Sequence, residues 1–81
     1  MKIRVKLFAV AREAAGRDSL ELDLPQGATI GQLRNQLGSQ VPQLSALVAQ
    51  MMFAVDTRYA DDATQIPPNA DVACIPPVSG G

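Results

Sequence analysis

The sequence predicts a single α+β domain in which helices cover one face of a mixed β-sheet. Apolar and basic residues alternate over Lys2–Leu7, as in a strand with one buried face. An apolar stripe with helical spacing runs from Ile30 to Leu37, and an apolar run at 72–75 follows a proline-rich turn signal. With 81 residues, 47% of them hydrophobic, the chain can build one small core and has no room for a second domain.

The first strand, Lys2–Leu7, is expected to turn its apolar residues to one face and its basic residues to the other. Good helix formers in Ala9–Ala15 end at Gly16, which favours a single helical turn leading to the next strand. That strand alternates leucine with polar residues over 19–24, and the Pro-Gln-Gly sequence at 25–27 ends it. Two strands in succession indicate an antiparallel pair.

Two helices are predicted in the middle of the chain. Thr29 indicates a helix start, because its hydroxyl can accept a hydrogen bond from an orphan backbone amide while Gln32 reaches back in a capping box. Gly38 is expected to end this helix. A second, shorter amphipathic helix is expected to begin near Pro42, a residue tolerated in a first helical turn. The inward stripes are Ile30, Leu33 and Leu37 in the first helix, and Leu44, Leu47, Val48 and Met51 in the second.

Three short strands are predicted after the helices. Met52–Val55 and Arg58–Ala60 are expected to form a hairpin around a tight turn at 56–57. Residues 61–71 are polar and contain prolines, so they are expected to form a loop before the final strand at 72–75. The residues predicted to be buried together are Ile3, Val5, Leu7, Leu20, Leu22, Leu33 and Leu37, with Lys2, Arg4 and Lys6 exposed.

Composition excludes several function classes. The chain has no histidine, so it cannot form a histidine metal site or a Ser-His or Cys-His pair. Its one cysteine, Cys74, cannot form an internal disulfide and is expected to be a small buried hydrophobic residue. A net charge of −1, with two phenylalanines, one tyrosine and no tryptophan, argues against nucleic-acid binding.

The expected location is the cytoplasm. The longest uncharged stretch is interrupted by polar residues and proline, so we expect no transmembrane helix, and the first residues do not resemble a signal peptide. A single cysteine suits a reducing compartment. The adjacent Asp61 and Asp62 are expected to belong to a solvated loop rather than to an acid/base or cation site.

Covalent chemistry is expected in the C-terminal segment, residues 76–81, which follows a folded domain at residues 1–75. The two prolines of this segment favour an extended course away from the sheet, and six extended residues reach about 20 Å. Gly80 and Gly81 have no side chains, so they can enter a channel too narrow for a Cβ atom. Terminal glycines alone are a weak signal, since many chain ends are simply frayed. Their position directly after a strand and two prolines favours the α-carboxylate of Gly81 as the reacting group.

Four segments carry a resemblance to a known family, at residues 2–8, 9–13, 69–73 and 76–81. Through them the whole chain resembles the small subunits of molybdopterin synthase, which are ubiquitin-like sulfur carriers with the β-grasp fold. The Pro-Pro-Val-Ser-Gly-Gly ending is much more specific than Gly-Gly. Where the family commonly has Gly-Asp-Glu-Val before the last strand, this chain has Asn69 followed by Ala-Asp-Val. Asparagine tolerates the left-handed turn conformation, so the same turn remains possible.

The resemblance implies a sulfur carrier for molybdenum cofactor biosynthesis. An activating enzyme would use ATP to adenylate the Gly81 carboxylate, and a sulfurtransferase would supply the sulfur that converts it into a thiocarboxylate. In a heterotetramer with the large synthase subunit, the thiocarboxylate would donate sulfur to the pterin precursor. The large subunit would supply the catalytic side chains, and this chain would itself bind no cofactor.

A carrier also needs a docking surface. By strand alternation Phe8 points away from the core, and Ile75 does so if Val72 and Cys74 point inward. The resemblance places Tyr59 at a position that contacts the large subunit. We expect these side chains to form an exposed patch beside the C-terminal segment. The expected partner-binding residues are Phe8, Tyr59, Ile75, Pro76, Pro77, Val78 and Ser79.

Three alternative functions remain open at this stage. A thiamine-pathway sulfur carrier would share the fold and the Gly-Gly end, although the chain length and residues 76–79 favour the molybdenum pathway. A protein modifier would form isopeptide bonds between Gly81 and lysines of target proteins. A non-covalent binding module would have an inert C-terminal segment.

Overall fold

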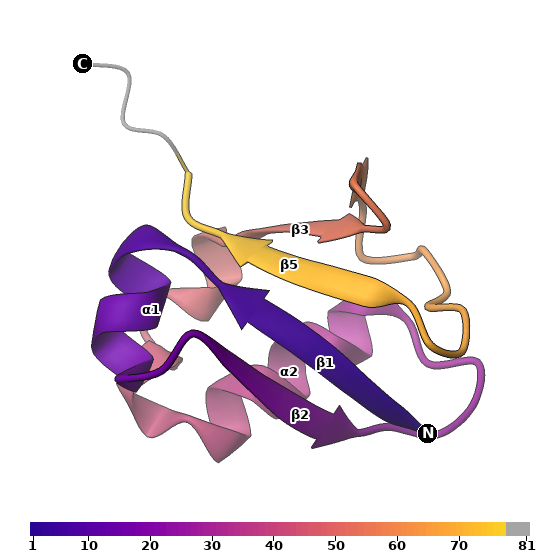
Figure 1. Cartoon of the computed structure of the whole chain (residues 1–81), viewed down its shortest axis with the longest axis horizontal. Coiled ribbons are helices and arrows are strands. Elements are labelled where there is room, and N and C mark those ends of the chain that lie inside the picture. Colours follow the sequence, from indigo (N-terminus) through magenta and orange to yellow (C-terminus); the bar gives the residue numbers. More distant parts are fainter. Residues whose placement is uncertain (78–81) are drawn as a thin grey trace.

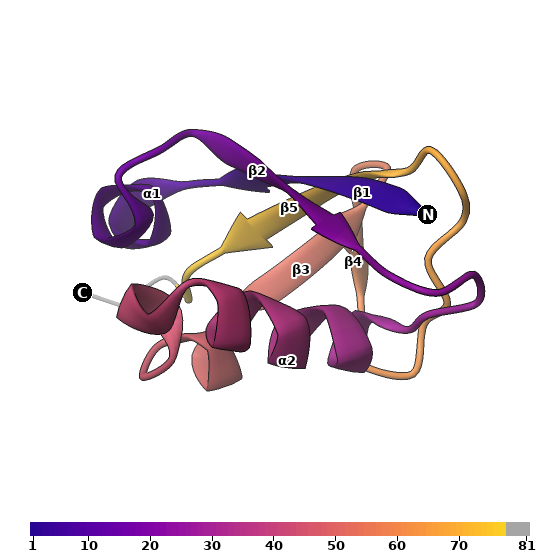
Figure 2. The same ribbon diagram turned by 90° about the horizontal axis from the view of Figure 1, so that it is seen from below.

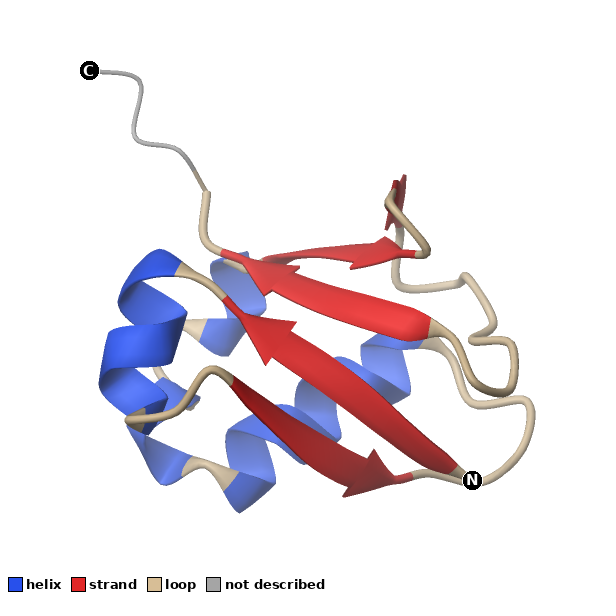
Figure 3. Cartoon of the chain, in the orientation of Figure 1, coloured by secondary structure: helices blue, strands red, loops and turns tan. Residues whose placement is uncertain are grey.

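The computed structural model describes residues 1–77 and contains a five-stranded mixed β-sheet with helices on one side (Figures 1 and 3). In chain order the elements are β1 (Lys2–Leu7), α1 (Ala9–Ala15), β2 (Ser19–Asp23), α2 (Ile30–Gln40), the 3₁₀ turns η1 (Pro42–Leu44) and η2 (Val48–Gln50), β3 (Met52–Val55), β4 (Arg58–Ala60) and β5 (Asp71–Ile75). The strand order is β2-β1-β5-β3-β4. β1 and β5 run parallel, and the other neighbouring strands are antiparallel. This is the predicted α+β class, with the arrangement of a β-grasp domain.

The core lies between the sheet and α2, which crosses beneath the strands (Figure 2). Every residue predicted to be buried is at most 8% exposed, and the basic residues of β1 are exposed, so the predicted register is confirmed. Phe53 of β3 is the largest fully buried side chain. Helix α1 closes one end of the same core with the buried Ala11. The opposite face of the sheet, here called the outer face, is not covered by any element of residues 1–77 (Figure 2).

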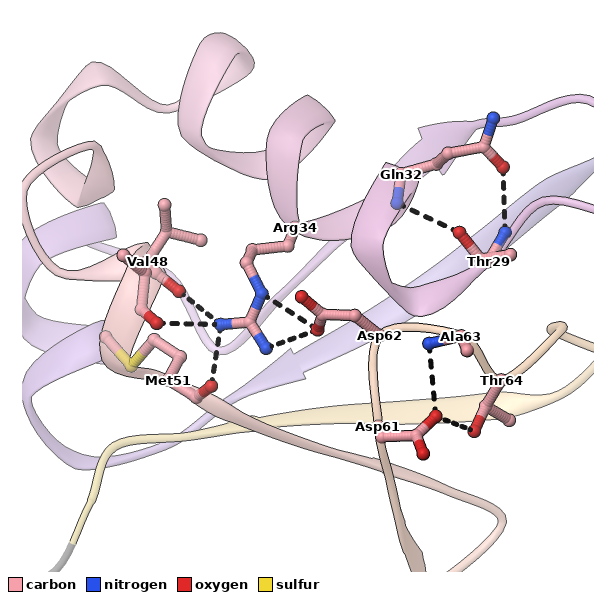
Figure 4. Close-up of polar contacts among 10 residues, drawn as sticks. Thr29, Gln32, Arg34, Val48, Met51, Asp61, Asp62, Ala63 and Thr64 are labelled. Atoms are coloured by element: carbon pink, nitrogen blue, oxygen red, sulfur yellow. Dashed lines mark hydrogen bonds and ion pairs between the residues drawn. The ribbon is translucent and has the colours of Figure 1, made fainter.

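Helix α2 begins as predicted but ends later. The Thr29 hydroxyl accepts from the backbone amide of Gln32 at 3.3 Å, and the Gln32 carbonyl oxygen Oε1 accepts from the Thr29 amide at 2.9 Å (Figure 4). The prediction that Gly38 ends the helix is wrong, because α2 continues to Gln40. The residue before Pro42 is driven out of helical geometry, and this is what stops the helix. Gly38 instead permits close packing, since a Cβ there would lie 3.0 Å from a Val48 methyl carbon.

The predicted second helix is also wrong, because residues 42–50 form the two short turns η1 and η2. Leu44 and Met51 are buried as the stripe predicted. The carbonyl oxygens of Val48, Ala49 and Met51 accept hydrogen bonds from the guanidinium of Arg34, and the Val48 carbonyl also accepts from the Met51 amide in a 3₁₀ turn at 3.2 Å. Helix α1 is longer than the single turn predicted and ends at the left-handed Gly16 (φ 74°).

The last part of the chain follows the prediction closely. Asp56 and Thr57 both have positive φ angles (48° and 72°) in the hairpin between β3 and β4. The turn before β5 contains Asn69 at φ 63°, the left-handed conformation that asparagine tolerates. β5 starts at Asp71, one residue earlier than predicted. Among residues 1–77, no helix has the length and apolar character needed to span a membrane.

Candidate functional site

The C-terminal segment leaves the sheet at the end of its central strand. Because β1 and β5 are parallel, their C-terminal ends lie at the same end of the sheet, next to the start of α1 (Figure 1). Pro76 is half-buried there and Pro77 is exposed. The predicted site residues Val78, Ser79, Gly80 and Gly81 lie outside the described residues.

Phe8 and Ile75 meet on the outer face, as predicted. Phe8 follows β1 in an extended conformation (φ −122°, ψ 152°), so the strand alternation continues through it and its ring turns away from the core. Its amide donates to the Cys74 carbonyl at 3.3 Å, which places it beside β5. On the other side of β5, Ile75 pairs with Met52. Phe8 is 45% exposed and Met52 is 44% exposed, so apolar surface extends across three neighbouring strands.

A second row of outer-face residues reaches Tyr59 at the edge of the sheet. Tyr59 is 67% exposed and pairs with Ala54, which in turn pairs with Ala73. The two alanines are small, and a shallow hollow of about 220 Å³ lies over them between Phe8 and Thr57. We call the apolar side chains of both rows the outer-face patch, which consists of Phe8, Met52, Ala54, Tyr59, Ala73 and Ile75.

The structure therefore brings together Phe8, Tyr59 and Ile75, with Pro76 adjacent in the chain. Sequence reasoning missed Met52. The alternation of side chains along β3 could have placed it on the outer face, because Met52 must face away from the core if Phe53 faces into it. The pairing of β3 with β5 was not fixed by the sequence, so Met52 could not be placed opposite Ile75.

Cys74 is fully buried beneath this face. Burial raises the pKa of its thiol to about 11, an effect that the nearby Arg34 charge partly opposes. The thiolate is the nucleophilic form of cysteine, so this side chain is kept in its unreactive state at neutral pH. The prediction of a small buried hydrophobic residue is confirmed.

Asp61 and Asp62 are exposed, as predicted, but both have structural roles that the sequence did not reveal (Figure 4). One carboxylate oxygen of Asp62 accepts from Nε and Nη2 of Arg34 at 3.2 and 2.8 Å. A carboxylate oxygen of Asp61 accepts from the Ala63 amide and the Thr64 hydroxyl, which closes a local turn. Neither carboxylate is positioned for acid/base chemistry.

Arg34 is the centre of this polar network. Its Nη1 donates to the carbonyl oxygens of Val48 at 2.6 Å and Met51 at 2.8 Å. The guanidinium carbon lies 4.9 Å from the ring centroid of Phe53. The side chain thus joins α2 to η2, to β3 and to the loop before β5.

A small β-grasp domain with an apolar outer face beside its C-terminal segment has the architecture of a ubiquitin-like protein. The chain matches the ThiS family over residues 5–81. It is 36% identical over 83 residues to the molybdopterin synthase sulfur carrier subunit of Dictyostelium discoideum, covering 99% of this chain and 96% of the relative. It is 33% identical over 81 residues to the corresponding subunit of Arabidopsis thaliana, covering 100% and 84%. The chain belongs to the ThiS family and, within it, to the molybdopterin synthase sulfur carrier subunits.

Solved structures agree on the fold. SAMP1 from Haloferax volcanii superposes with a TM-score of 0.86 at 26% identity, covering 100% of both chains. A protein from Pyrococcus furiosus, assigned as subunit 1 of a molybdopterin converting factor, has a TM-score of 0.85 at 28% identity, covering 96% of this chain and 99% of that one. The same fold occurs in the complex of subunits 1 and 2 of molybdopterin-converting factor from Helicobacter pylori, with a TM-score of 0.71 at 17% identity and full coverage of both chains.

Proposed function

We propose that this chain carries sulfur as a thiocarboxylate on Gly81 and donates it to a pterin precursor in molybdenum cofactor biosynthesis. The observation that supports this function is the similarity to named sulfur carrier subunits across the whole chain. The family match also continues through residue 81, and so includes the Gly-Gly sequence.

The proposed chemistry begins with activation of the carboxylate. A carboxylate is a poor electrophile, because its oxygen is a poor leaving group. An activating enzyme would join the Gly81 carboxylate to the AMP part of ATP and release pyrophosphate. A sulfur nucleophile supplied by a sulfurtransferase would then attack the carbonyl carbon and expel AMP. With a persulfide as the nucleophile, this attack would give an acyl disulfide. A second thiol would then attack the donor's sulfur, so that the S–S bond to Gly81 breaks, the sulfurtransferase is left with a disulfide and the carrier is released as a thiocarboxylate, in which sulfur has replaced one oxygen.

The side chains of the domain fit a carrier that supplies no catalytic group of its own. Cys74 is buried with a raised thiol pKa, and Asp61 and Asp62 are engaged in local structure. The large synthase subunit would supply the side chains that act on the pterin, and the activating enzyme would hold ATP. A cytoplasmic location remains a prediction based on the single cysteine.

The large subunit is the proposed occupant of the outer-face patch. The relatives are named as subunits of a synthase, which implies a further subunit to receive the sulfur. Phe8, Met52 and Tyr59 expose apolar surface that a partner would cover. The patch lies at the end of the sheet from which Pro76 and Pro77 leave, so docking there would direct the C-terminal segment into the partner. A heterotetramer of two small and two large subunits remains the expected assembly.

A protein modifier is the second candidate function. It is favoured by the structural similarity, at 26% identity, to SAMP1, whose full name is small archaeal modifier protein 1. Activation of Gly81 is common to both functions, and the acceptor differs. Conjugates in which Gly81 is linked to lysines of other proteins would accumulate in cells only if the modifier function holds. The identity to the named synthase subunits favours the molybdenum pathway over the thiamine pathway.

The decisive experiment measures the intact mass of the chain after incubation with ATP, the activating enzyme and a sulfur source. The chain should gain about 16 Da as sulfur replaces oxygen, an increment that a single oxidation of Cys74 to sulfenic acid would also produce. Fragmentation must therefore place the gain on the C-terminal peptide, and a Cys74→Ala variant should retain it. Deleting Gly81 should abolish the gain, since Gly80 would end about 3.5 Å short of the reacting position. A gain that depended on ATP and the activating enzyme, persisted after the deletion and mapped to Cys74 would contradict the proposal.

A further inference from the structure

The charges on the outer face are arranged in opposite pairs across neighbouring strands. Lys2 of β1 is opposite Asp23 of β2. Arg4 lies between Glu21 of β2 and Asp71 of β5. Residues directly opposite each other in adjacent strands have their Cβ atoms about 5 Å apart, close enough for unlike charges to attract. The first two basic residues of β1 therefore have acidic neighbours within the domain.

Lys6 is the exception in β1. Its register partners are Ser19 of β2 and Ala73 of β5, neither of which is acidic. Lys6 is exposed and lies next to Phe8 at the end of the strand from which the C-terminal segment leaves. Its ammonium group is the one basic group of β1 that has no carboxylate opposite it in the sheet.

The surroundings of Lys6 form a basic hollow. A depression of about 300 Å³ is lined by Arg4, Lys6, Phe8, Arg12, Asp18 and Ser19, together with the backbone end of β1. The single carboxylate there, Asp18, lies 4.0 Å from Nε of Arg12. Three basic side chains thus share the hollow with one acidic side chain, which is already beside a basic partner. Attraction for an incoming negative charge is therefore strongest on the Lys6 side.

The hollow is continuous with the outer-face patch. Lys6 and Phe8 line both this hollow and the smaller one over Ala54 and Ala73. A partner that covers Phe8 must therefore also cover or contact Lys6. Asp71 also lines the smaller hollow, but it is the register partner of Arg4 and not of Lys6. Burying an ammonium group without its own counter-charge is costly, so this surface favours a partner that brings an acceptor with negative charge.

We propose that the hollow receives one carboxylate side chain of the large subunit, an Asp or Glu that pairs with Lys6 while an adjacent apolar side chain packs on Phe8. This inference rests on the proposed function, because it names the chemistry of that docking partner. A single carboxylate fits better than a polyanion, since Asp18, Glu21 and Asp71 all lie close to the basic side chains and would repel further negative charge.

The first test is the affinity of the full chain for the large subunit, measured by calorimetry at low and high salt. Lys6→Glu should weaken binding by about tenfold or more, because it places like charges together, and Lys6→Met should weaken it by about threefold. Lys2→Glu is the matched control, on the same strand and face, and should change the affinity by less than about twofold. Binding of Lys6→Met should also depend less on salt than binding of the unchanged chain.

The second test locates the carboxylate. A water-soluble carbodiimide condenses a lysine amine with a carboxylate it touches, forming an amide with loss of water. In the complex it should link Lys6 to an Asp or Glu of the large subunit, and mass spectrometry of the peptides would identify the pair. Lys6→Arg keeps the positive charge and lacks the amine, so it should retain affinity and lose this cross-link. Lys2→Arg should leave the cross-link in place.

The outcomes separate this inference from the function on which it rests. Failure of the unchanged chain to bind the large subunit would overturn both. Normal binding and sulfur delivery, combined with unchanged affinity of Lys6→Glu or with no cross-link from Lys6, would overturn only the proposed carboxylate contact. An effect of Lys6→Glu confined to the activating enzyme would also overturn it.

Discussion

Phe8 stands at the end of β1, between the basic hollow and the rest of the outer-face patch. Replacing it by alanine should weaken binding to the large subunit by ~1–2 kcal/mol, because exposed aromatic side chains contribute disproportionately when a partner buries them. The fold should be unaffected, since the residue is 45% exposed. Calorimetry gives the affinity and thermal unfolding gives the stability. Val10→Ala is the control, because Val10 is 44% exposed but belongs to α1. Equal affinity of both variants would remove Phe8 from the interface.

Cys74 makes the stability of the domain sensitive to alkaline pH. Folding raises the pKa of its thiol from 9.0 to about 11, so the folded state holds this proton more tightly than the unfolded state. The contribution is fully present below pH 9 and is lost as pH rises from about 9 to about 11, with a total on the order of 2–3 kcal/mol. Urea unfolding across this range should show the loss. Cys74→Ala should be less stable at neutral pH but should lack this component of the alkaline decline, and an identical decline in both proteins would contradict the assignment.

The sequence was most informative about the orientation of individual side chains at the site. Strand alternation alone turned Phe8 and Ile75 outward and Cys74 inward, because the side-chain period of a strand leaves two choices of face. The structure confirms all three. Alternation could not reveal which residue of another strand lies opposite. The place of Met52 opposite Ile75, and the lack of an acidic register partner for Lys6, therefore became visible only with the register.

At the scale of elements, Arg34 determines the path of the chain after α2. Arg34→Met should destabilise the domain by ~2–4 kcal/mol, because it removes the charged donor from the carbonyls of Val48 and Met51, leaves Val48 with only the backbone bond from the Met51 amide, and removes the contact with Phe53. Denaturant unfolding measures the loss, and hydrogen exchange should accelerate first around η2. Asp62→Asn is the matched control. It removes only the ion pair with a carboxylate that is 59% exposed and should cost at most ~1 kcal/mol. Equal losses in the two variants would show that the carbonyl contacts are unimportant.

The same residue explains where prediction of the elements failed. The strands and the capping box at Thr29 follow from short-range patterns and were predicted, and the left-handed Asn69 agrees with what asparagine tolerates. The region 42–50 has a helical stripe, yet the carbonyls of Val48 and Ala49, with that of Met51 next to it, bond to the side chain of Arg34, 14 to 17 residues earlier in the chain. Gly38 looked like a helix end and instead allows Val48 to pack closely. The first error arises from a tertiary contact that no local pattern encodes, whereas the second arises because the local stop signal is Pro42 and not Gly38.

At the scale of the whole molecule, one face of the β-sheet packs against the helices to form the core, and the outer face is available to a partner. Three of the four large exposed hydrophobic residues within 1–77, Phe8, Met52 and Tyr59, lie on the outer face. The C-terminal segment begins at the same end of that face. Within residues 1–77, exposed apolar side chains thus gather on the face beside which the C-terminal segment begins. If Gly81 is the reacting end, as proposed, we expect an enzyme that acts on it to approach from this face.

This geometry predicts that the activating enzyme and the large subunit exclude each other. Gly81 can occupy only one active site at a time, and both partners would compete for the outer-face patch. Adding excess large subunit should therefore inhibit adenylation of the chain, measured as pyrophosphate release by the activating enzyme. The inhibition should be relieved by raising the activating enzyme, as expected for competition. Adenylation that continued at an undiminished rate with all of the carrier bound to the large subunit would show that the two partners use different surfaces and that Gly81 remains accessible in the complex.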